Sequence, residues 1–172
     1  SICGQAPSVY PEVTEKLEQD GVKAFSDAFN VLLQSIENRR KAAQDALTES
    51  DERFRAMSDA SPLGIFVSDK EGNCVYTNAA YHKISGLEQE QTLGTKWTQA
   101  IHPEDRLRVL TNWRESLRSQ TLFQSEFRFL RGDGSVVWTR LNAAAMLKGQ
   151  RVIGRVQIVE DITERKLVES ML

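Results

Sequence analysis

Few side chains in this 172-residue sequence have the types and spacing that metal or nucleophilic chemistry requires. The candidate metal ligands with soft or imidazole donors are Cys3, Cys74, His82 and His102. They are scattered along the chain, whereas a structural zinc site takes its ligands in closely spaced pairs. Two cysteines do not make a disulfide framework, and the sequence contains no nucleophile–base pair and no phosphate-binding loop. We therefore predict that this chain has no metal site and no enzymatic activity.

The composition restricts the classes of partner. The chain has 22 Lys and Arg against 24 Asp and Glu, and a net charge of −2 gives no electrostatic reason to expect binding to nucleic acid or an anionic membrane. No apolar run is long enough to span a bilayer, and no signal peptide is visible. These features predict a reduced, cytoplasmic protein.

A long helix is expected before the first strand. Apolar residues recur at spacings near three and four from Phe29 to Ala60. This helix should end at Ser61-Pro62, because the residue before a proline avoids the α region. Upstream, the pattern favours a polar helix over 11–20 and a short strand over 21–26, while the basic run 39–41 suggests a solvated joint.

Residues 63–85 predict a hairpin followed by a short helix. Strands over 63–68 and 74–77 flank a turn, and Asn78 can cap a helix that Gly86 closes. The stretch 87–101 is predicted to be irregular. A stronger helix opens at His102-Pro103, and its buried stripe is expected to consist of Leu107, Leu110, Trp113 and Leu117.

Three longer strands complete the expected domain. They begin near Phe123, Val136 and Val152 and form a meander. The second of them is apolar on both faces, so its outer face should be covered by the N-terminal helix or by a second protomer. The element order predicts an α+β fold, with short helices on one face of a five-stranded antiparallel sheet that follows a long N-terminal helix.

The last strand runs directly into a helix start at Asp161. Thr163 is predicted to be the N-cap of that helix, and Glu164 lies in its positively polarised first turn. If the meander pairs in sequence order, Asp161 should lie near Arg131. A capped joint can form or break when the sheet shifts, so it is suited to a two-state role; the alternative is a plain N-cap with no switching role.

Residues from about 49 to 166 resemble a PAS sensory domain of the type found in bacterial signalling proteins. The ordered motifs that carry the resemblance include Ser61-Pro62-Leu63-Gly64-Ile65, Tyr76-Thr77-Asn78-Ala79-Ala80, Ile101-His102-Pro103-Glu104-Asp105, Glu126-Phe127-Arg128 and Asp161-Ile162-Thr163-Glu164-Arg165-Lys166. The resemblance implies signal relay through the strand-to-helix joint at Asp161 and Thr163, with Arg131 as its neighbour. It also implies adjacent PAS, kinase or cyclase domains in the parent protein.

Family members can hold haem, flavin or small metabolites between sheet and helices. His82 and His102 are poorly placed as axial haem ligands, and the stretch 91–104 lacks the cysteine of flavin photoreceptors. We therefore expect neither haem nor flavin. The aromatic residues leave two alternatives, a filled core or a pocket for a small organic molecule; they are Tyr76, Trp97, Trp113, Phe127, Phe129 and Trp138.

Residues 2–36 resemble the end of the catalytic barrel of phosphoenolpyruvate synthase. The resemblance rests on Ile2-Cys3-Gly4-Gln5-Ala6-Pro7-Ser8 and Tyr10-Pro11-Glu12. In that family, the cysteine at the position of Cys3 exchanges a proton with enolpyruvate. The rest of the barrel is missing, so Cys3 is expected to be only a remnant of an active site.

Four segments follow from these patterns: a barrel-end fragment or helical extension over 1–36, a connecting helix over 37–60, a PAS-like domain over 61–163, and the start of an outgoing signalling helix over 164–172. The favoured function is a homodimeric sensory module that signals to an absent output domain. The alternatives are a ligand-free structural dimerisation spacer and a regulatory fragment of a phosphoenolpyruvate-utilising phosphotransferase.

Overall fold

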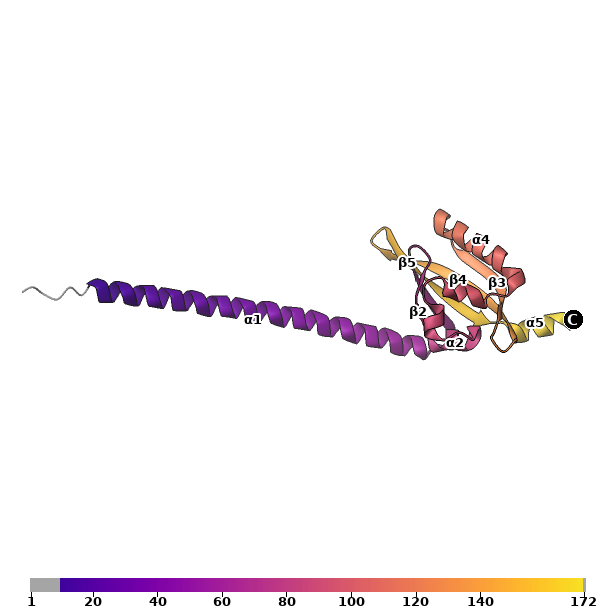
Figure 1. Cartoon of the computed structure of the whole chain (residues 1–172), viewed down its shortest axis with the longest axis horizontal. Helices are drawn as coiled ribbons and strands as arrows, with labels where there is room; N and C mark the ends of the chain where they lie inside the picture. The colour runs from indigo at the N-terminus through magenta and orange to yellow at the C-terminus, as the bar shows by residue number, and fades with distance from the viewer. Residues whose placement is uncertain (1–9, 172) are drawn as a thin grey trace, which may run out of the picture. The chain divides into compact units, whose positions relative to one another are not determined.

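The computed structural model describes residues 10–171, with side chains described from residue 15. The chain divides into two units between Glu52 and Arg53. The first is formed by most of α1 (Tyr10–Asp59), a continuous 50-residue helix (Figure 1). The strand predicted over 21–26 is therefore wrong, since that segment is helical, and the helix also continues through the basic run 39–41 without a break.

The second unit contains the predicted five-stranded antiparallel sheet. Its spatial order is β2-β1-β5-β4-β3, so that the last three strands form a meander beside the first hairpin. The strands are β1 (Gly64–Asp69), β2 (Cys74–Thr77), β3 (Phe123–Leu130), β4 (Val136–Lys148) and β5 (Arg151–Asp161). The predicted fold class is confirmed.

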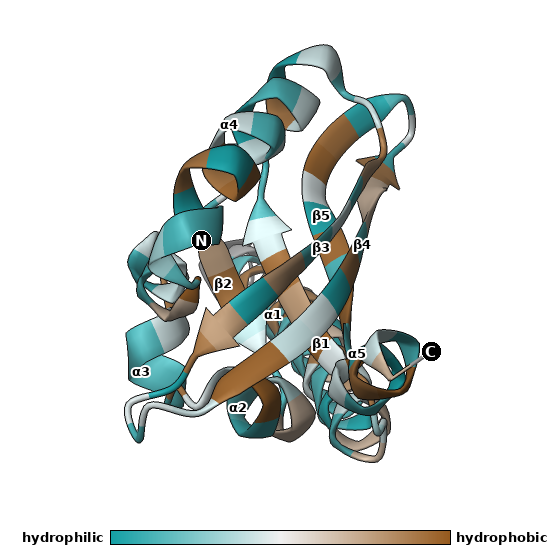
Figure 2. Ribbon diagram, turned by 90° about the vertical axis from the view of Figure 1, so that its right-hand side faces the viewer, coloured by the Kyte–Doolittle hydropathy of each residue, from teal (hydrophilic) through white to brown (hydrophobic). Residues whose placement is uncertain are grey.

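Three short helical segments and the longer α4 lie between β2 and β3, and one helix follows β5. They are α2 (Ala79–Ser85), α3 (Gln89–Thr92), a 3-10 helix (Lys96–Ala100), α4 (Pro103–Ser119) and α5 (Thr163–Ser170). The region predicted as irregular thus contains α3 and the 3-10 helix. Figure 2 shows α4 and α5 on opposite sides of the sheet.

Asn78 joins the end of α1 to the domain. It is the N-cap of α2, and its side chain also binds backbone groups of the last turn of α1 and of β1. Gly86 ends α2 in the left-handed conformation, as predicted, with φ of 73°.

The core lies between the sheet and the helices that precede β3. Strand alternation places Phe123, Phe127 and Phe129 on the buried face of β3. The stripe of α4 differs from the prediction: its fully buried positions are Asp105, Val109, Trp113 and Ser116, while Leu110 and Leu117 pack at its margin and Leu107 is 79% exposed. An acidic residue enters this stripe because Asp105 is paired with an arginine of the sheet.

Candidate functional site

Aromatic side chains surround a very small cavity in the core. Its volume is about 10 Å³, at the lower limit of the space that one water molecule needs. The lining is largely aromatic and consists of Phe66, Tyr81, Trp97, Val109, Trp113, Phe123, Phe127, Phe129, Leu141 and Gln157. A cavity of this size does not fit haem, flavin or a metabolite without displacement of core side chains.

Two polar atoms in the lining have no protein partner. Trp97 Nε1 and Gln157 Oε1 are buried without a hydrogen bond, although Gln157 Nε2 donates to Ser68 Oγ at 3.1 Å. Trp97 Nε1 is a donor and Gln157 Oε1 is an acceptor.

Four of the six predicted pocket aromatics line this cavity, and two do not. Trp97, Trp113, Phe127 and Phe129 are buried in the core. Trp138 alternates with the buried residues of β4 and lies on the outer face of the sheet. Tyr76 is half-buried and packs against Phe54 in the last turns of α1, with ring centroids 5.2 Å apart.

The predicted pocket residues did not include six that line the cavity: Phe66, Tyr81, Val109, Phe123, Leu141 and Gln157. Tyr81 could have been found from its position on the capped helix that begins after Asn78, since it lies one turn before the buried Ile84 and Ser85. Gln157 gave no such signal, because a polar residue between two apolar neighbours of a strand ordinarily faces solvent.

The histidines and Cys74 have structural surroundings. His82 Nε2 lies 2.8 Å from Thr77 Oγ1, and His102 is the N-cap of α4, where its Nδ1 accepts from the Glu104 backbone N–H. Burial raises the pKa of Cys74 to about 11, so its thiol is protonated at neutral pH. Within residues 10–171 there is no group of three or more His, Cys, Asp or Glu side chains arranged to hold a metal ion. Cys3 lies outside the described residues.

The joint between β5 and α5 is bound to the backbone of Trp138 on β4. Trp138 N–H donates to Thr163 Oγ1 at 3.0 Å, and the Ile162 N–H donates to the Trp138 carbonyl at 2.8 Å. Asp161 Oδ1 accepts from the Thr163 N–H at 2.9 Å. The prediction that Thr163 is the N-cap is therefore wrong. Ile162 occupies that position, and the Thr163 hydroxyl instead binds the neighbouring strand.

Glu126 on β3 is a further anchor of α5 that the sequence reasoning did not single out. Its carboxylate binds Lys166 at 2.8 Å, Arg165 at 2.7 Å and Arg140 at 3.2 Å. Hydrogen bonds from Lys166 and then Arg165 lower the pKa of Glu126 to about 2. One carboxylate therefore ties the first turn of α5 to the outer face of the sheet.

Arg131 does not belong to this joint. Its Nη2 donates to the Lys83 carbonyl at 2.6 Å and its Nε donates to the Ile84 carbonyl at 3.2 Å, both near the end of α2. Asp161 is paired with Thr139 in the sheet register. The predicted proximity of Arg131 to Asp161 is therefore wrong, because the guanidinium satisfies helix-terminal carbonyls instead.

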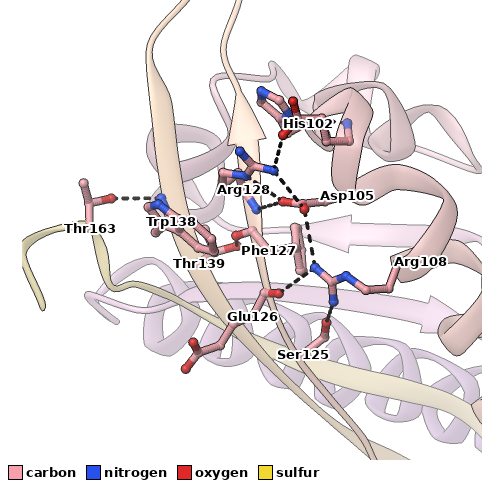
Figure 3. Close-up of polar contacts among 11 residues, drawn as sticks. His102, Asp105, Arg108, Ser125, Glu126, Phe127, Arg128, Trp138, Thr139 and Thr163 are labelled. Atoms are coloured by element: carbon pink, nitrogen blue, oxygen red, sulfur yellow. Dashed lines mark hydrogen bonds and ion pairs between the residues drawn. The ribbon is translucent and has the colours of Figure 1, made fainter. Parts of the chain in front are cut away.

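A second polar cluster links α4 to the edge of the sheet. Asp105 accepts hydrogen bonds from the Arg128 backbone N–H and from Arg128 Nε, each at 2.9 Å (Figure 3). Arg108 reaches the same strand through the Glu126 carbonyl at 3.1 Å. These contacts satisfy outward-facing backbone groups of the edge strand β3 and so protect it from further pairing.

Among the helices of residues 10–171, none combines the length and apolar character needed to cross a membrane.

The geometry contains two places of functional interest: a nearly filled aromatic core, and a strand-to-helix joint held by Asp161, Thr163 and Glu126.

Comparisons with known proteins agree with this architecture. The family model of the PAS fold matches residues 58–167, well over half of the chain. The sensor histidine kinase TmoS of Ectopseudomonas mendocina is 29% identical over 143 residues, which cover 80% of this chain and 14% of TmoS. The probable diguanylate cyclase DgcE of Escherichia coli (strain K12) is 28% identical over 135 residues, which cover 76% of this chain and 12% of DgcE.

A solved PAS domain has the same fold. The crystal structure of the PAS domain of a protein from Colwellia psychrerythraea superposes with a TM-score of 0.56 at 23% identity, covering 67% of this chain and 98% of that domain. The chain itself spans about an eighth of the length of the two curated relatives.

Proposed function

Because this chain belongs to the PAS-fold family, we propose that it is the cytoplasmic sensory and dimerisation module of a longer bacterial signalling protein, which relays a signal through α5 to an output domain. The observation that carries the proposal is the joint, where Asp161 and Thr163 connect the end of β5 to α5 and to β4. The output would be a histidine kinase or a diguanylate cyclase, the activities named for TmoS and DgcE.

The joint can be tested by replacing both Asp161 and Thr163 with alanine. Neither side chain packs in the apolar core, so the sheet should stay folded while amide hydrogen exchange over residues 163–171 becomes faster. The loss of these two hydrogen bonds should cost roughly 0.5–1.5 kcal/mol each. Glu164→Ala is the matched control, since it lies in the same turn but leaves both bonds in place. Unchanged exchange in the double variant would mean that the joint is ordinary packing.

In the parent protein, the same double variant should change the response of the output domain to the signal without changing its basal activity. Output should stop responding to the signal, while basal output persists because the catalytic domain is untouched. An output that still responds normally would favour a structural spacer over a sensor.

Homodimerisation is the second part of the proposal. All residues of α1 from 15 to 57 except Ser35 are exposed, and apolar side chains recur along this segment at helical spacing: Val22, Phe25, Phe29, Leu32 and Ile36. A second copy of α1 in parallel orientation would cover this stripe as in a coiled coil. The outer face of the sheet, with the half-buried Val67, Val156 and Ile158, would extend the interface.

Sedimentation tests the dimer with two neighbouring substitutions. Leu32→Glu places a charge in the stripe and should give a monomer. Val31→Glu, one residue away and outside the stripe, should leave the dimer intact. An unmodified chain that is monomeric at about tens of micromolar, a concentration that populates micromolar interfaces, would contradict dimerisation.

We further propose that the core senses without haem or flavin. The 10 Å³ cavity supports this, and a small organic molecule could enter only if core side chains moved. Purified protein should show no visible absorbance band, and native mass spectrometry would reveal a bound small molecule as added mass. The phosphoenolpyruvate synthase resemblance of residues 2–36 remains a prediction; the gene sequence upstream of Ser1 decides it.

A further inference from the structure

Arg128 connects the helical side of the domain to its outer face. Its side chain belongs to the outer face, because Arg128 alternates with the buried Phe127 and Phe129 on β3. The guanidinium nevertheless reaches α4, where Nε and Nη2 bind the two oxygens of Asp105 at 2.9 and 3.1 Å. Nη2 also binds Glu104 at 2.8 Å. A paired fork of this kind fixes the position and the plane of the guanidinium.

The same guanidinium lies over the indole of Trp138. Arg128 and Trp138 face each other across β3 and β4, and the guanidinium carbon is 5.4 Å from the ring centroid. Lys166 Nζ of α5 is also 5.4 Å from that centroid. Trp138 is therefore in contact with one cation anchored to α4 and with another carried by α5 (Figure 3 shows Asp105, Arg128 and Trp138).

The α4 end of this chain of contacts is attached to the core. Val109 and Trp113 line the cavity, and Asp105 lies one turn before Val109 on the same buried face of α4. Asp105 holds both the side chain and the backbone N–H of Arg128. A change in core packing that moves α4 would therefore move Arg128 as well, since the carboxylate binds it at three points.

We propose that Asp105, Arg128 and Trp138 are positioning residues that couple the placement of α4 on the core to the docking of α5. This inference rests on the proposed function of α5 as the signalling helix. It adds a route around the edge of the sheet. Asp105 of α4 fixes the position of the Arg128 guanidinium, the guanidinium fixes the position of the Trp138 indole, and the indole fixes the position of Lys166. The route differs from the Asp161 and Thr163 joint, which connects α5 only to β4 and β5.

The test uses the whole 172-residue chain and measures hydrogen exchange in α5. Asp105→Asn weakens the hold on Arg128 without touching α5. It should make α5 amides exchange about two- to fivefold faster, the factor expected for loss of one cation–π contact of ordinary strength. Glu115→Gln is the matched control, because Glu115 lies in the same helix and pairs with Arg118 of that helix; it should leave α5 exchange unchanged.

A second background decides whether the effect passes through the indole. In Trp138→Leu, which keeps the backbone bonds to the joint, Asp105→Asn should produce no further change in α5. Exchange of the Arg128 backbone amide shows that the substitution has acted, since the hydrogen bond from this N–H to the residue at position 105 is weakened in both backgrounds. If the asparagine keeps that bond, Asp105→Ala replaces it in the same comparison.

Two results would overturn the route. One is unchanged α5 exchange while the Arg128 amide exchanges faster. The other is an equal increase in α5 exchange with and without the indole. In either case, faster α5 exchange in the Asp161 and Thr163 double variant would leave the proposed function standing, so the failures of the two proposals are distinguishable.

Discussion

Asn78 allows a sharp test of how the incoming helix is tied to the domain. The side chain is 1% exposed, and all its hydrogen-bonding groups are used. Oδ1 accepts from the Ile65 and Tyr81 N–H groups at 2.8 and 3.0 Å. Nδ2 donates to the Ser58 and Leu63 carbonyls at 2.7 and 3.1 Å. One amide thus connects α1, β1 and α2.

The expected cost of Asn78→Ala follows from these contacts. Loss of the α2 cap costs about 1 kcal/mol, and each of the other three bonds contributes about 1 kcal/mol in a buried setting. The free energy of unfolding should fall by about 4 kcal/mol, a large share of the roughly 5–15 kcal/mol of an ordinary domain. Urea unfolding followed by tryptophan fluorescence measures it.

Asn78→Asp separates the two halves of the amide. The substitution keeps the acceptor but places a carboxylate oxygen against two carbonyls, which raises the pKa of the new carboxyl in the folded state. The folded state then holds its proton more tightly than the unfolded state, so the pH-dependent part of the penalty is absent below the unfolded pKa of about 4 and grows as the pH rises above it. Asn142→Asp, on the exposed outer face, is the control and should show little of this pH dependence.

For Asn78→Ala, a loss of unfolding free energy below about 1 kcal/mol would refute the reasoning, since that is the size of one cap alone.

Three further outcomes are expected. The Cys74 thiol, 3% exposed and with a pKa raised by burial to about 11, should react with a thiol reagent only as the domain unfolds, as peptide mapping would show. Gly154→Ala should lower the free energy of unfolding by about 2 kcal/mol or more, because a Cβ there would lie 2.3 Å from a β1 carbonyl oxygen, whereas Gly132→Ala, with nothing within 4 Å, should change it little. Lys166 and Arg165 lower the pKa of Glu126 from 4.5 to about 2, so its hold on α5 should be complete above pH 4.5 and be lost as the pH falls toward 2; NMR shifts of α5 that stay constant over this range would contradict the anchoring role.

The strand β5 shows where sequence pattern succeeds and where it fails. Its position and its pairing with β4 follow from turn signals and apolar content. Its facing does not, because Arg155 and Gln157 are buried while Val156 and Ile158 are only half-buried. The reversal depends on partners remote in sequence: Arg155 donates to the Ser116 and Thr121 carbonyls at the end of α4. The sequence of a single strand does not indicate such remote partners.

The joint illustrates the same limit at shorter range. A threonine followed by an acidic residue after a strand is typical of an N-cap, and this pattern predicts the helix start to within one residue. The bond that Thr163 makes is nevertheless to Trp138, 25 residues earlier in the chain. Local propensity locates the helix, whereas the pairing of β4 with β5 decides which groups lie within reach of its first residue. The sequence does not predict the ion pairs of Glu126 with α5 for the same reason, since they too depend on strand pairing.

The attachment of the two terminal helices bears on the proposed relay. The Asn78 side chain binds both the last turn of α1 and β1, and α5 follows directly after β5. Because β1 and β5 are antiparallel neighbours with Gly64 opposite Val159, the strand that follows the incoming helix begins at the same end of this pair at which the strand before the outgoing helix finishes. A change of twist between β1 and β5 would therefore reorient both helices together. Substitutions at Asn78 and at Thr163 should accordingly show non-additive effects on α5 exchange, although Asn78 caps α2, Thr163 begins α5 and no hydrogen bond joins their side chains.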